Sequence, residues 1–187
     1  IEIIRGDACF QSYICHIPRS TLELGLSGKL DCLDGMIFPS TCDVIRNLSG
    51  IWKMLLPGVW THYLDVPQNF DPAVGGLFLR QELRAIAAGV AALTGRLVTD
   101  EALSRAIVLY NENRRLVRAL GAMRRASPGR VPASDAYVLL RAGCVLPVEQ
   151  QNRKLAAYLE AASRRARPDL DNCRILVRGT FCEPPPL

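Results

Sequence analysis

Apolar positions early in the chain predict a strand, a helix and a second strand in that order. The apolar run Met36–Phe38 follows a glycine and is typical of the end of a buried strand. Over 43–56, apolar residues recur at three- and four-residue steps, which predicts a helix that ends at Pro57. The stretch "VWTHYLDVP" then predicts a second short strand that Pro67 ends. This order indicates a βαβ unit and therefore a parallel sheet.

Further along the chain the pattern changes to successive helices. The first is expected to end at Gly95, a residue suited to a helix C-cap. Thr99 can cap the next helix, which ends before Pro128. Two more helices are predicted, over 134–142 and after Pro147. The apolar stripes of the first two of these helices are Leu79, Leu83, Ile86 and Val90, and Leu103, Ile107, Tyr110, Val117 and Leu120.

The segment 173–179, "CRILVRG", predicts a new strand after the helices. We therefore expect an α/β fold in three parts. Residues 1–75 would form part of a parallel-sheet (Rossmann-like) domain, 76–170 a helical section, and 171–187 the first strand of a second, truncated α/β domain. The chain does not begin with Met and stops just past the predicted strand, so we expect an internal fragment of a longer protein.

Composition indicates a packed soluble protein, with 49% apolar and 22% charged residues. No apolar stretch approaches the ~20 residues that span a bilayer, and no basic segment followed by a long apolar one marks a secretion signal. Much of the net charge of +5 lies on arginines spaced along predicted helices. Solvated helix faces explain this spacing, and a site for an anionic partner such as coenzyme A is the alternative. No signature of nucleic-acid binding accompanies it.

The chain has seven cysteines, an odd number that, without a secretion signal, indicates a reducing cytoplasm rather than a disulfide framework. Cys42 follows the first predicted strand and precedes a helix, at the edge where α/β sheets bind their ligands. The amides and positive dipole end of that helix would favour a thiolate or an anionic metal cluster. Cys15 stands just before another predicted helix, so two thiolates can share one site. No C-x2-C spacing occurs, and buried structural cysteines are the alternative.

Other familiar catalytic signatures are absent from the sequence. We find no P-loop, dinucleotide-binding glycine fingerprint, nucleophile-elbow serine or zinc-protease helix. His62 lies within a strand pattern and is interpreted as structural. His16 adjoins Cys15, but a catalytic Cys–His pair normally comes from distant segments. The polar stretch 110–116 lies in the middle of a predicted helix, so we expect hydrogen bonds between helices there.

Several blocks resemble the benzoyl-CoA reductase/2-hydroxyacyl-CoA dehydratase family, in order and through essentially the whole chain. The blocks are "YICHIPRSTLELGLSGKLDCLDGMIFPSTCDVIRNL", "YLDVPQNF", "LTGRLVTDEALSRAIVLYNENRRLVRAL" and "RILVRGTFCEPPPL". The first block is most similar to the smaller, cluster-bearing (C, or gamma) subunits on the reductase side of the family. Members are longer, with two α/β domains and a helical section.

The resemblance implies a [4Fe–4S] cluster, which each such subunit binds through three cysteines. Two of the three match positions of this chain. Cys15 stands in a C-x3-R block with Arg19, and Cys42 stands in the "STCD" block. These two residues are therefore the expected iron ligands and cofactor-binding residues.

The third cysteine of the family lies well downstream, which places it beyond Leu187. Cys182, in "GTFCE", is a reserve candidate for this ligand. Cys9 is a rival to Cys15 because it lies only six residues earlier. The remaining cysteines are interpreted as structural: Cys32, Cys144 and Cys173.

The resemblance further implies an oxidoreductase subunit that acts in anaerobic aromatic degradation. In that role, ATP-driven low-potential electrons reduce the aromatic ring of benzoyl-CoA to a cyclic dienoyl-CoA. The implied partners are the aryl-CoA thioester, a homologous second cluster-bearing subunit and ATP-hydrolysing iron–sulfur subunits that donate electrons. The alternatives are a 2-hydroxyacyl-CoA dehydratase subunit, which eliminates water by radical chemistry, and a non-catalytic iron–sulfur electron relay. No nucleic acid or membrane partner is expected, and no catalytic residue is assigned.

Overall fold

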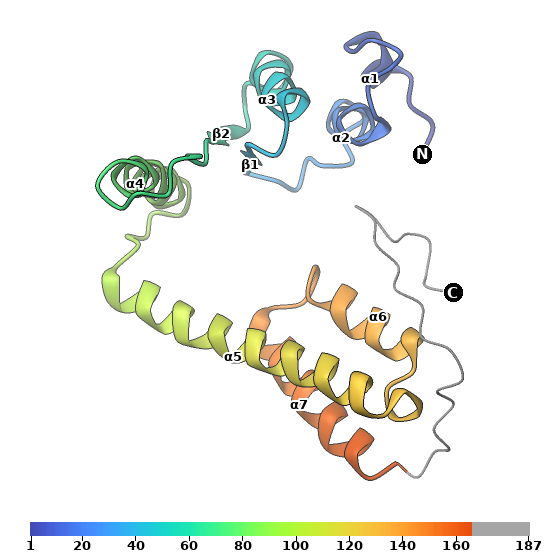
Figure 1. Cartoon of the computed structure of the whole chain (residues 1–187). Coiled ribbons are helices and arrows are strands. Elements are labelled where there is room, and N and C mark those ends of the chain that lie inside the picture. The colour runs from blue at the N-terminus through green and yellow to red at the C-terminus, as the bar shows by residue number, and fades with distance from the viewer. Residues whose placement is uncertain (166–187) are drawn as a thin grey trace. The chain divides into compact units, whose positions relative to one another are not determined.

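The structure, a computed structural model, describes residues 1–165 and divides the chain into two compact units, Ile1–Val98 and Thr99–Leu187 (Figure 1). Each unit has an apolar core of its own. The described part is mixed α/β, with a two-stranded parallel sheet and helices elsewhere, which confirms the expected fold class. The strand predicted over 173–179 lies outside the described residues.

The first unit contains the βαβ arrangement that the sequence predicts. Its two strands pair in parallel, with Gly35 opposite Trp60 and Pro39 opposite Leu64. One helix connects them, and two helices precede them. A last helix, α4, contacts the second strand. The elements are α1 (Arg5–Ala8), α2 (His16–Leu26), β1 (Gly35–Pro39), α3 (Asp43–Leu55), β2 (Trp60–Leu64) and α4 (Gly75–Thr94).

The core of the first unit lies where α2 and α3 meet the sheet. Trp52 packs its ring against Phe38 of β1, with ring centroids 5.7 Å apart. Burial of each such side chain contributes about 1.5–3 kcal/mol to folding. The fully buried apolar residues of this core are Leu22, Phe38, Leu48 and Trp52.

Helix α4 packs against β2 through Gly89, where an added Cβ atom would lie 2.1 Å from the ring of Trp60. Gly95 ends the helix with a positive φ of 68°, as expected of a C-cap glycine. The apolar stripe predicted for this helix is only partly buried, as shown by Leu83, which is 52% exposed. Within residues 1–165, the two short strands cover only part of α4, with Leu93 against Gly35 of β1 and Gly89 against Trp60 of β2, so α4 buries less than the periodicity suggests.

The second unit is helical in its described part. Thr99 caps its first helix, because the backbone N–H of Ala102 donates to the Thr99 hydroxyl at 3.2 Å. The elements are α5 (Asp100–Ala126), η1 (Pro128–Arg130), α6 (Ala133–Ala142) and α7 (Val148–Ser163). Its buried core consists of Leu116, Leu120, Val131, Ala136, Leu155 and Ala162.

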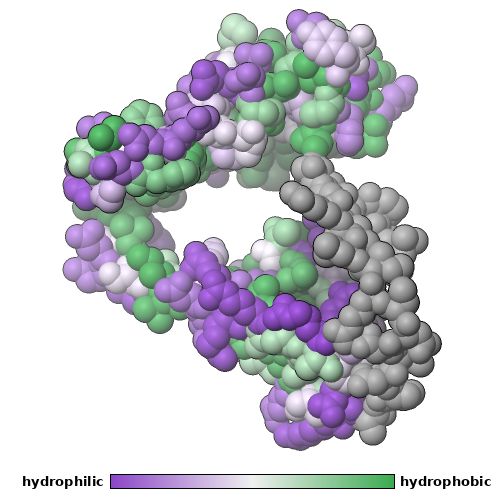
Figure 2. Space-filling model, viewed as in Figure 1, coloured by the Kyte–Doolittle hydropathy of each residue, from purple (hydrophilic) through white to green (hydrophobic). Residues whose placement is uncertain are grey.

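Only the C-terminal half of α5 contributes to this core. Ile107 and Tyr110, in the N-terminal half, are 59% and 52% exposed. Figure 2 shows the resulting apolar surface, in green, over the beginning of α5. Although α5 has 27 residues, no helix among the described residues combines the length and apolar character needed to cross a membrane.

Candidate functional site

Cys42 lies at the junction between β1 and α3. It is the N-cap residue of α3, with an extended backbone (φ −164°, ψ 167°), and its thiol is free and makes no capping hydrogen bond. The backbone carbonyl of Cys42 accepts from the N–H of Ile45 at 3.1 Å, which begins the helix. The side chain is exposed. An exposed thiol therefore stands at a helix N-terminus, a position that favours an anionic group.

Cys15 occupies the corresponding position on α2. It is the N-cap residue of that helix (φ −57°, ψ 153°), makes no side-chain capping bond and is exposed. Pro18 lies in the first turn of α2, where its missing N–H leaves no broken helical hydrogen bond. Both expected cluster ligands thus have the same local structure.

Helices α2 and α3 pack on one another near their C-terminal ends. Gly25, near the end of α2, contacts Trp52 and Leu56, at the end of α3. Gly25 and Trp52 each follow their cysteine by ten residues, about 15 Å of helix. Each helix also leads into the beginning of a strand. Helices α2 and α3 are neighbours (Figure 1), and Cys42 lies at the edge of the sheet where β1 ends.

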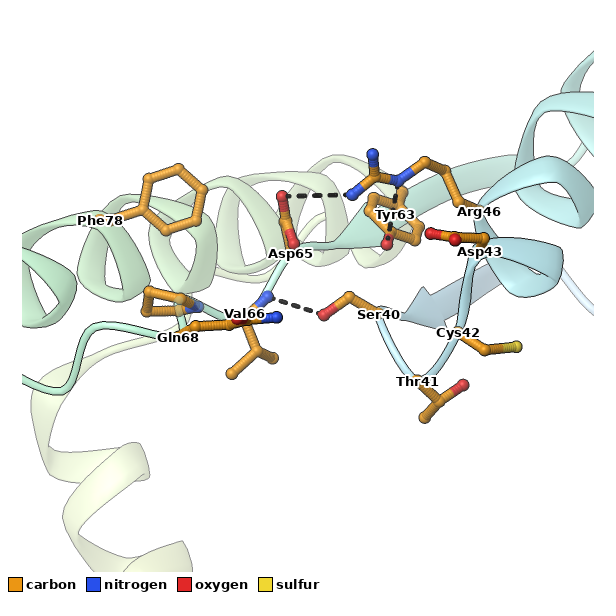
Figure 3. Close-up of a pocket in the computed structure, with 11 residues that line it drawn as sticks. Ser40, Thr41, Cys42, Asp43, Arg46, Tyr63, Asp65, Val66, Gln68 and Phe78 are labelled. Carbon is orange, nitrogen blue, oxygen red and sulfur yellow. Dashed lines mark hydrogen bonds and ion pairs between the residues drawn. The ribbon is translucent and has the colours of Figure 1, made fainter.

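A pocket of about 530 Å³ opens beside Cys42 at this edge of the sheet (Figure 3). The loops that follow β1 and β2 form its walls, and Phe78 of α4 lies on the side opposite Cys42. The other lining residues are Ser40, Thr41, Asp43, Arg46, Tyr63, Asp65, Val66, Pro67 and Gln68. Most of these residues are polar, so the pocket presents hydrogen-bonding groups rather than an apolar surface.

Arg46 supplies the positive charge of this pocket. Its Nε atom donates to the Tyr63 hydroxyl at 3.4 Å, and its guanidinium lies over the Tyr63 ring, 5.4 Å from the centroid. Its Nη2 atom lies 4.0 Å from a carboxylate oxygen of Asp65. The hydrogen bond to Tyr63 raises the pKa of Arg46 above its ordinary value. Tyr63 therefore positions the Arg46 guanidinium, whose N–H groups can bind an anionic or carbonyl group in the pocket.

The remaining sequence candidates have different surroundings. Cys9 is half-buried, packs against the core, and its thiol donates to the carbonyl of Arg5 at 3.6 Å. Cys32 and Cys144 are exposed and do not pack in a core. Their interpretation as structural residues stays a prediction. Among residues 1–165, no group of three or more His, Cys, Asp or Glu side chains could hold a metal ion. Cys173 and Cys182 lie outside the described residues.

Arg19, from the C-x3-R block, pairs with Asp7 of α1 at 2.8 Å. The neighbouring Glu23 accepts the backbone N–H groups of Ile4 and Gly6, both at 2.9 Å. The hydrogen bond from Gly6 is the main reason that the pKa of Glu23 is lowered. These contacts attach the start of the chain to α2, the helix that begins after Cys15.

Within residues 1–165, neither histidine makes a hydrogen bond to a cysteine thiol. His62 stacks on Trp60, with ring centroids 5.9 Å apart. Its Nε2 atom is 3.4 Å from a carboxylate oxygen of Glu82 on α4, without the geometry of a hydrogen bond. This contact joins β2 to α4 and supports the interpretation of His62 as a structural residue. His16 begins α2 and is exposed.

Sequence reasoning missed the residues that surround Cys42: Ser40, Arg46, Tyr63 and Asp65. A signal for two of them was available, because parallel neighbouring strands end at the same sheet edge. Ser40 follows the end of β1, and Asp65 follows the end of β2. The pairing of β1 with β2 was therefore enough to bring these two residues to the site.

Comparison with known proteins identifies the family. The sequence model described as 2-hydroxyglutaryl-CoA dehydratase, D-component, matches residues 1–187. The chain belongs to this family, which confirms the family resemblance.

Among individual relatives, the chain is 53% identical over 187 residues to the C subunit of benzoyl-CoA reductase of Thauera aromatica, covering 100% of this chain and 48% of the relative. It is 22% identical over 182 residues to the (R)-phenyllactyl-CoA dehydratase beta subunit of Clostridium sporogenes, covering 97% and 49%. It is 26% identical over 186 residues to the beta subunit of (R)-2-hydroxyglutaryl-CoA dehydratase of Acidaminococcus fermentans, covering 97% and 48%. The chain spans about half the length of these relatives.

Proposed function

We propose that this chain is part of the C (gamma) subunit of a benzoyl-CoA reductase. The supporting observation is its 53% identity, along all 187 residues, to the C subunit of the Thauera aromatica benzoyl-CoA reductase. The dehydratase subunits match at only 22–26%. The reaction is a two-electron reduction, in which two electrons and two protons add to the aromatic ring. The product is a cyclic dienoyl-CoA, and the thioester bond stays intact.

The proposal includes a [4Fe–4S] cluster held by Cys15 and Cys42. The donor set suits such a group, because both thiols are free, exposed and located at helix N-termini. The third thiolate would come from beyond Leu187, with Cys182 in reserve. When bound, such a cluster supplies single low-potential electrons next to the substrate and has one iron without a cysteine ligand.

In this proposal the pocket beside Cys42 receives the acyl end of the thioester. Phe78, which is 40% exposed, offers an aromatic face for a ring. Arg46, held by Tyr63, offers N–H donors to the thioester carbonyl oxygen. A donor at this oxygen favours electron entry, because negative charge develops there when the ring is reduced.

The proposed assembly is cytoplasmic and contains further subunits. A homologous cluster-bearing subunit would pair with this one, and separate ATP-hydrolysing iron–sulfur subunits would deliver the electrons. The relatives are named as subunits of enzymes, which supports an assembly of several chains. The sequence has no P-loop, in keeping with ATP hydrolysis on another subunit.

A substrate comparison tests this function. The chain, expressed from its full coding sequence with its neighbouring subunits and purified without oxygen, is given ATP and a low-potential reductant. We expect ATP-dependent conversion of benzoyl-CoA to a dienoyl-CoA, and no dehydration of 2-hydroxyglutaryl-CoA or phenyllactyl-CoA. Dehydration without ring reduction would identify the dehydratase alternative. A cluster closed by four cysteines, with neither activity, would identify an electron relay.

A further inference from the structure

Three consecutive backbone groups at the end of β2 are held by neighbouring segments. The carbonyl of Leu64 accepts from the backbone N–H of Ser40 at 2.9 Å. The N–H of Asp65 donates to a carboxylate oxygen of Glu82 at 3.3 Å. The N–H of Val66 donates to the Ser40 hydroxyl at 2.9 Å. Ser40 therefore makes two of these three bonds, one with its backbone and one with its side chain.

Ser40 also begins the short loop that carries Cys42. The loop continues through Thr41, whose N–H donates to the carbonyl of Pro39 at 2.7 Å, and Cys42 then starts α3. Figure 3 shows the bond between Ser40 and Val66, with Cys42 further along the same loop. The thiol thus follows, by two residues, the point at which its loop is tied to β2.

We infer that Ser40 is a positioning residue for Cys42: by accepting the N–H of Val66, its hydroxyl fixes the loop that holds the thiol at the sheet edge. This inference rests on the proposed function, because it assigns Cys42 to an iron–sulfur cluster. Removing a group that hydrogen-bonds a metal-ligating side chain typically weakens metal binding ten- to a hundredfold. Ser40 acts one step further out, on the loop that carries Cys42, so we expect an effect at the lower end of this range.

Two variants with side chains of equal size separate the effect of the Ser40 hydroxyl from the effect of bulk. Ser40→Thr keeps the acceptor, whereas Ser40→Val has the same shape without it. Ser40 is half-buried, so Ser40→Thr also tests whether the added methyl group is tolerated. Ser40→Ala removes the hydroxyl without adding bulk, so a folding defect caused by valine is distinguished from loss of the bond. Ser27→Ala is the matched control, because it also removes a serine hydroxyl, one that donates to the carbonyl of Leu24 at 3.3 Å on an exposed helix end away from the pocket.

The test measures the cluster itself in the full-length protein purified without oxygen. The measurements are the rate of iron loss to excess chelator, the electron paramagnetic resonance spectrum of the reduced protein, and Tm. We expect Ser40→Val and Ser40→Ala to lose iron roughly tenfold faster than wild type, with altered spectra. Ser40→Thr and Ser27→Ala should both behave as wild type.

Wild-type iron loss and spectra in Ser40→Val and Ser40→Ala would overturn the inference while leaving the proposed function intact. A lowered Tm with unchanged spectrum and iron loss would also overturn it, by showing a role in stability alone. A wild-type protein without iron, or a Cys42→Ala variant that retains all of its iron, would instead refute the proposed cluster and the role of Ser40 with it.

Discussion

Gly25 of α2 lies directly against the indole ring of Trp52 of α3, where an added Cβ atom would come within 2.6 Å of Cη2 of the ring. The Cδ1 atom of Leu56 lies 2.8 Å from the same Cβ position. Trp52 is only 1% exposed. The buried Trp52 ring is therefore enclosed by its neighbours, whereas Leu56 is half-buried. This contact sets how closely the two helices approach, and these are the helices that begin after Cys15 and Cys42.

We expect Gly25→Ala to lower the free energy of unfolding by about 1–3 kcal/mol, because the added methyl group overpacks the contact with Trp52. Urea denaturation measures this loss. Gly50, in exposed α3 surface with nothing within 4 Å of an added Cβ atom, is the matched control. Gly50→Ala should raise stability by about 0.5–1 kcal/mol. Equal losses at both positions would contradict the close approach of α2 and α3.

We expect Cys15→Ala and Cys42→Ala each to remove most of the bound iron from a wild-type content of about four atoms per chain. Both thiols are exposed and make no capping bond, so Tm of the iron-free protein should stay unchanged. Iron analysis and thermal denaturation measure the two effects separately. Cys32→Ala, which removes another exposed thiol, serves as the control and should keep its iron. Full iron content in either of the first two variants would remove that cysteine from the site.

We expect Asn113→Ala to lower the free energy of unfolding by about 1–3 kcal/mol, because it leaves buried acceptors without a donor. The Asn113 amide donates to the side-chain oxygens of Gln151 and Asn152, both at 2.8 Å. Gln151 and Asn152 are only 7% and 8% exposed. Denaturant unfolding of wild type and variant measures the difference.

The control for this variant lies two residues earlier on the same helix. Asn111 accepts from Arg114 at 2.6 Å on the exposed face of α5. Asn111→Ala should change stability by less than about 0.5 kcal/mol, as is usual for surface substitutions. If Asn111→Ala lowered the free energy of unfolding as much as Asn113→Ala, burial of the hydrogen-bond network would not explain the effect of Asn113→Ala.

We expect the contribution of Glu23 to stability to disappear on acidification. Its pKa is lowered in the folded chain, chiefly by the N–H of Gly6, so the unfolded chain binds a proton more readily. The stabilisation is therefore complete above the ordinary glutamate pKa of about 4.3 and is lost as pH falls through the lower folded value. Denaturation between pH 7 and pH 2 should show wild type and Glu23→Gln converging. Exposed Glu2→Gln should run parallel to wild type throughout, and convergence there as well would argue against this assignment.

Local signals in the sequence were enough to predict the βαβ unit and the helix ends. The apolar run before Cys42 became β1, and the three- and four-residue spacing after it became α3. Gly95 and Thr99 are the cap residues expected of them. These features depend on nearest neighbours along the chain, which a sequence displays directly.

Features that depend on distant partners were not predictable in the same way. Helix α1 has only four residues, too few to be stable alone, and exists because Glu23 binds the N–H groups around it. The stripe of α5 is apolar along its whole length, yet Ile107 is exposed whereas Leu120 is buried. Periodicity identifies an apolar face, but not which part of that face a neighbour covers.

Within the candidate site, Cys42 was predictable from its place between strand and helix, whereas Arg46 was not. In the sequence Arg46 is one of many helix arginines, and only the structure shows that Tyr63, 17 residues away, holds its guanidinium. The choice of Cys15 and Cys42 as ligands came from family blocks and stays a prediction. The packing of Gly25 on Trp52 adds that the two helices preceded by these cysteines are in contact.

Cysteine is a poor residue with which to begin a helix, because neither Cys15 nor Cys42 bonds the free N–H groups of the turn that follows it. An iron-free chain would therefore carry two frayed helix starts, which an anionic cluster at both thiols would stabilise. Cofactor loading and folding are then thermodynamically linked, as they are in other metalloproteins. If the proposed cluster is present, the iron-free subunit would be the form more open to proteases, so iron supply would affect how much folded subunit accumulates.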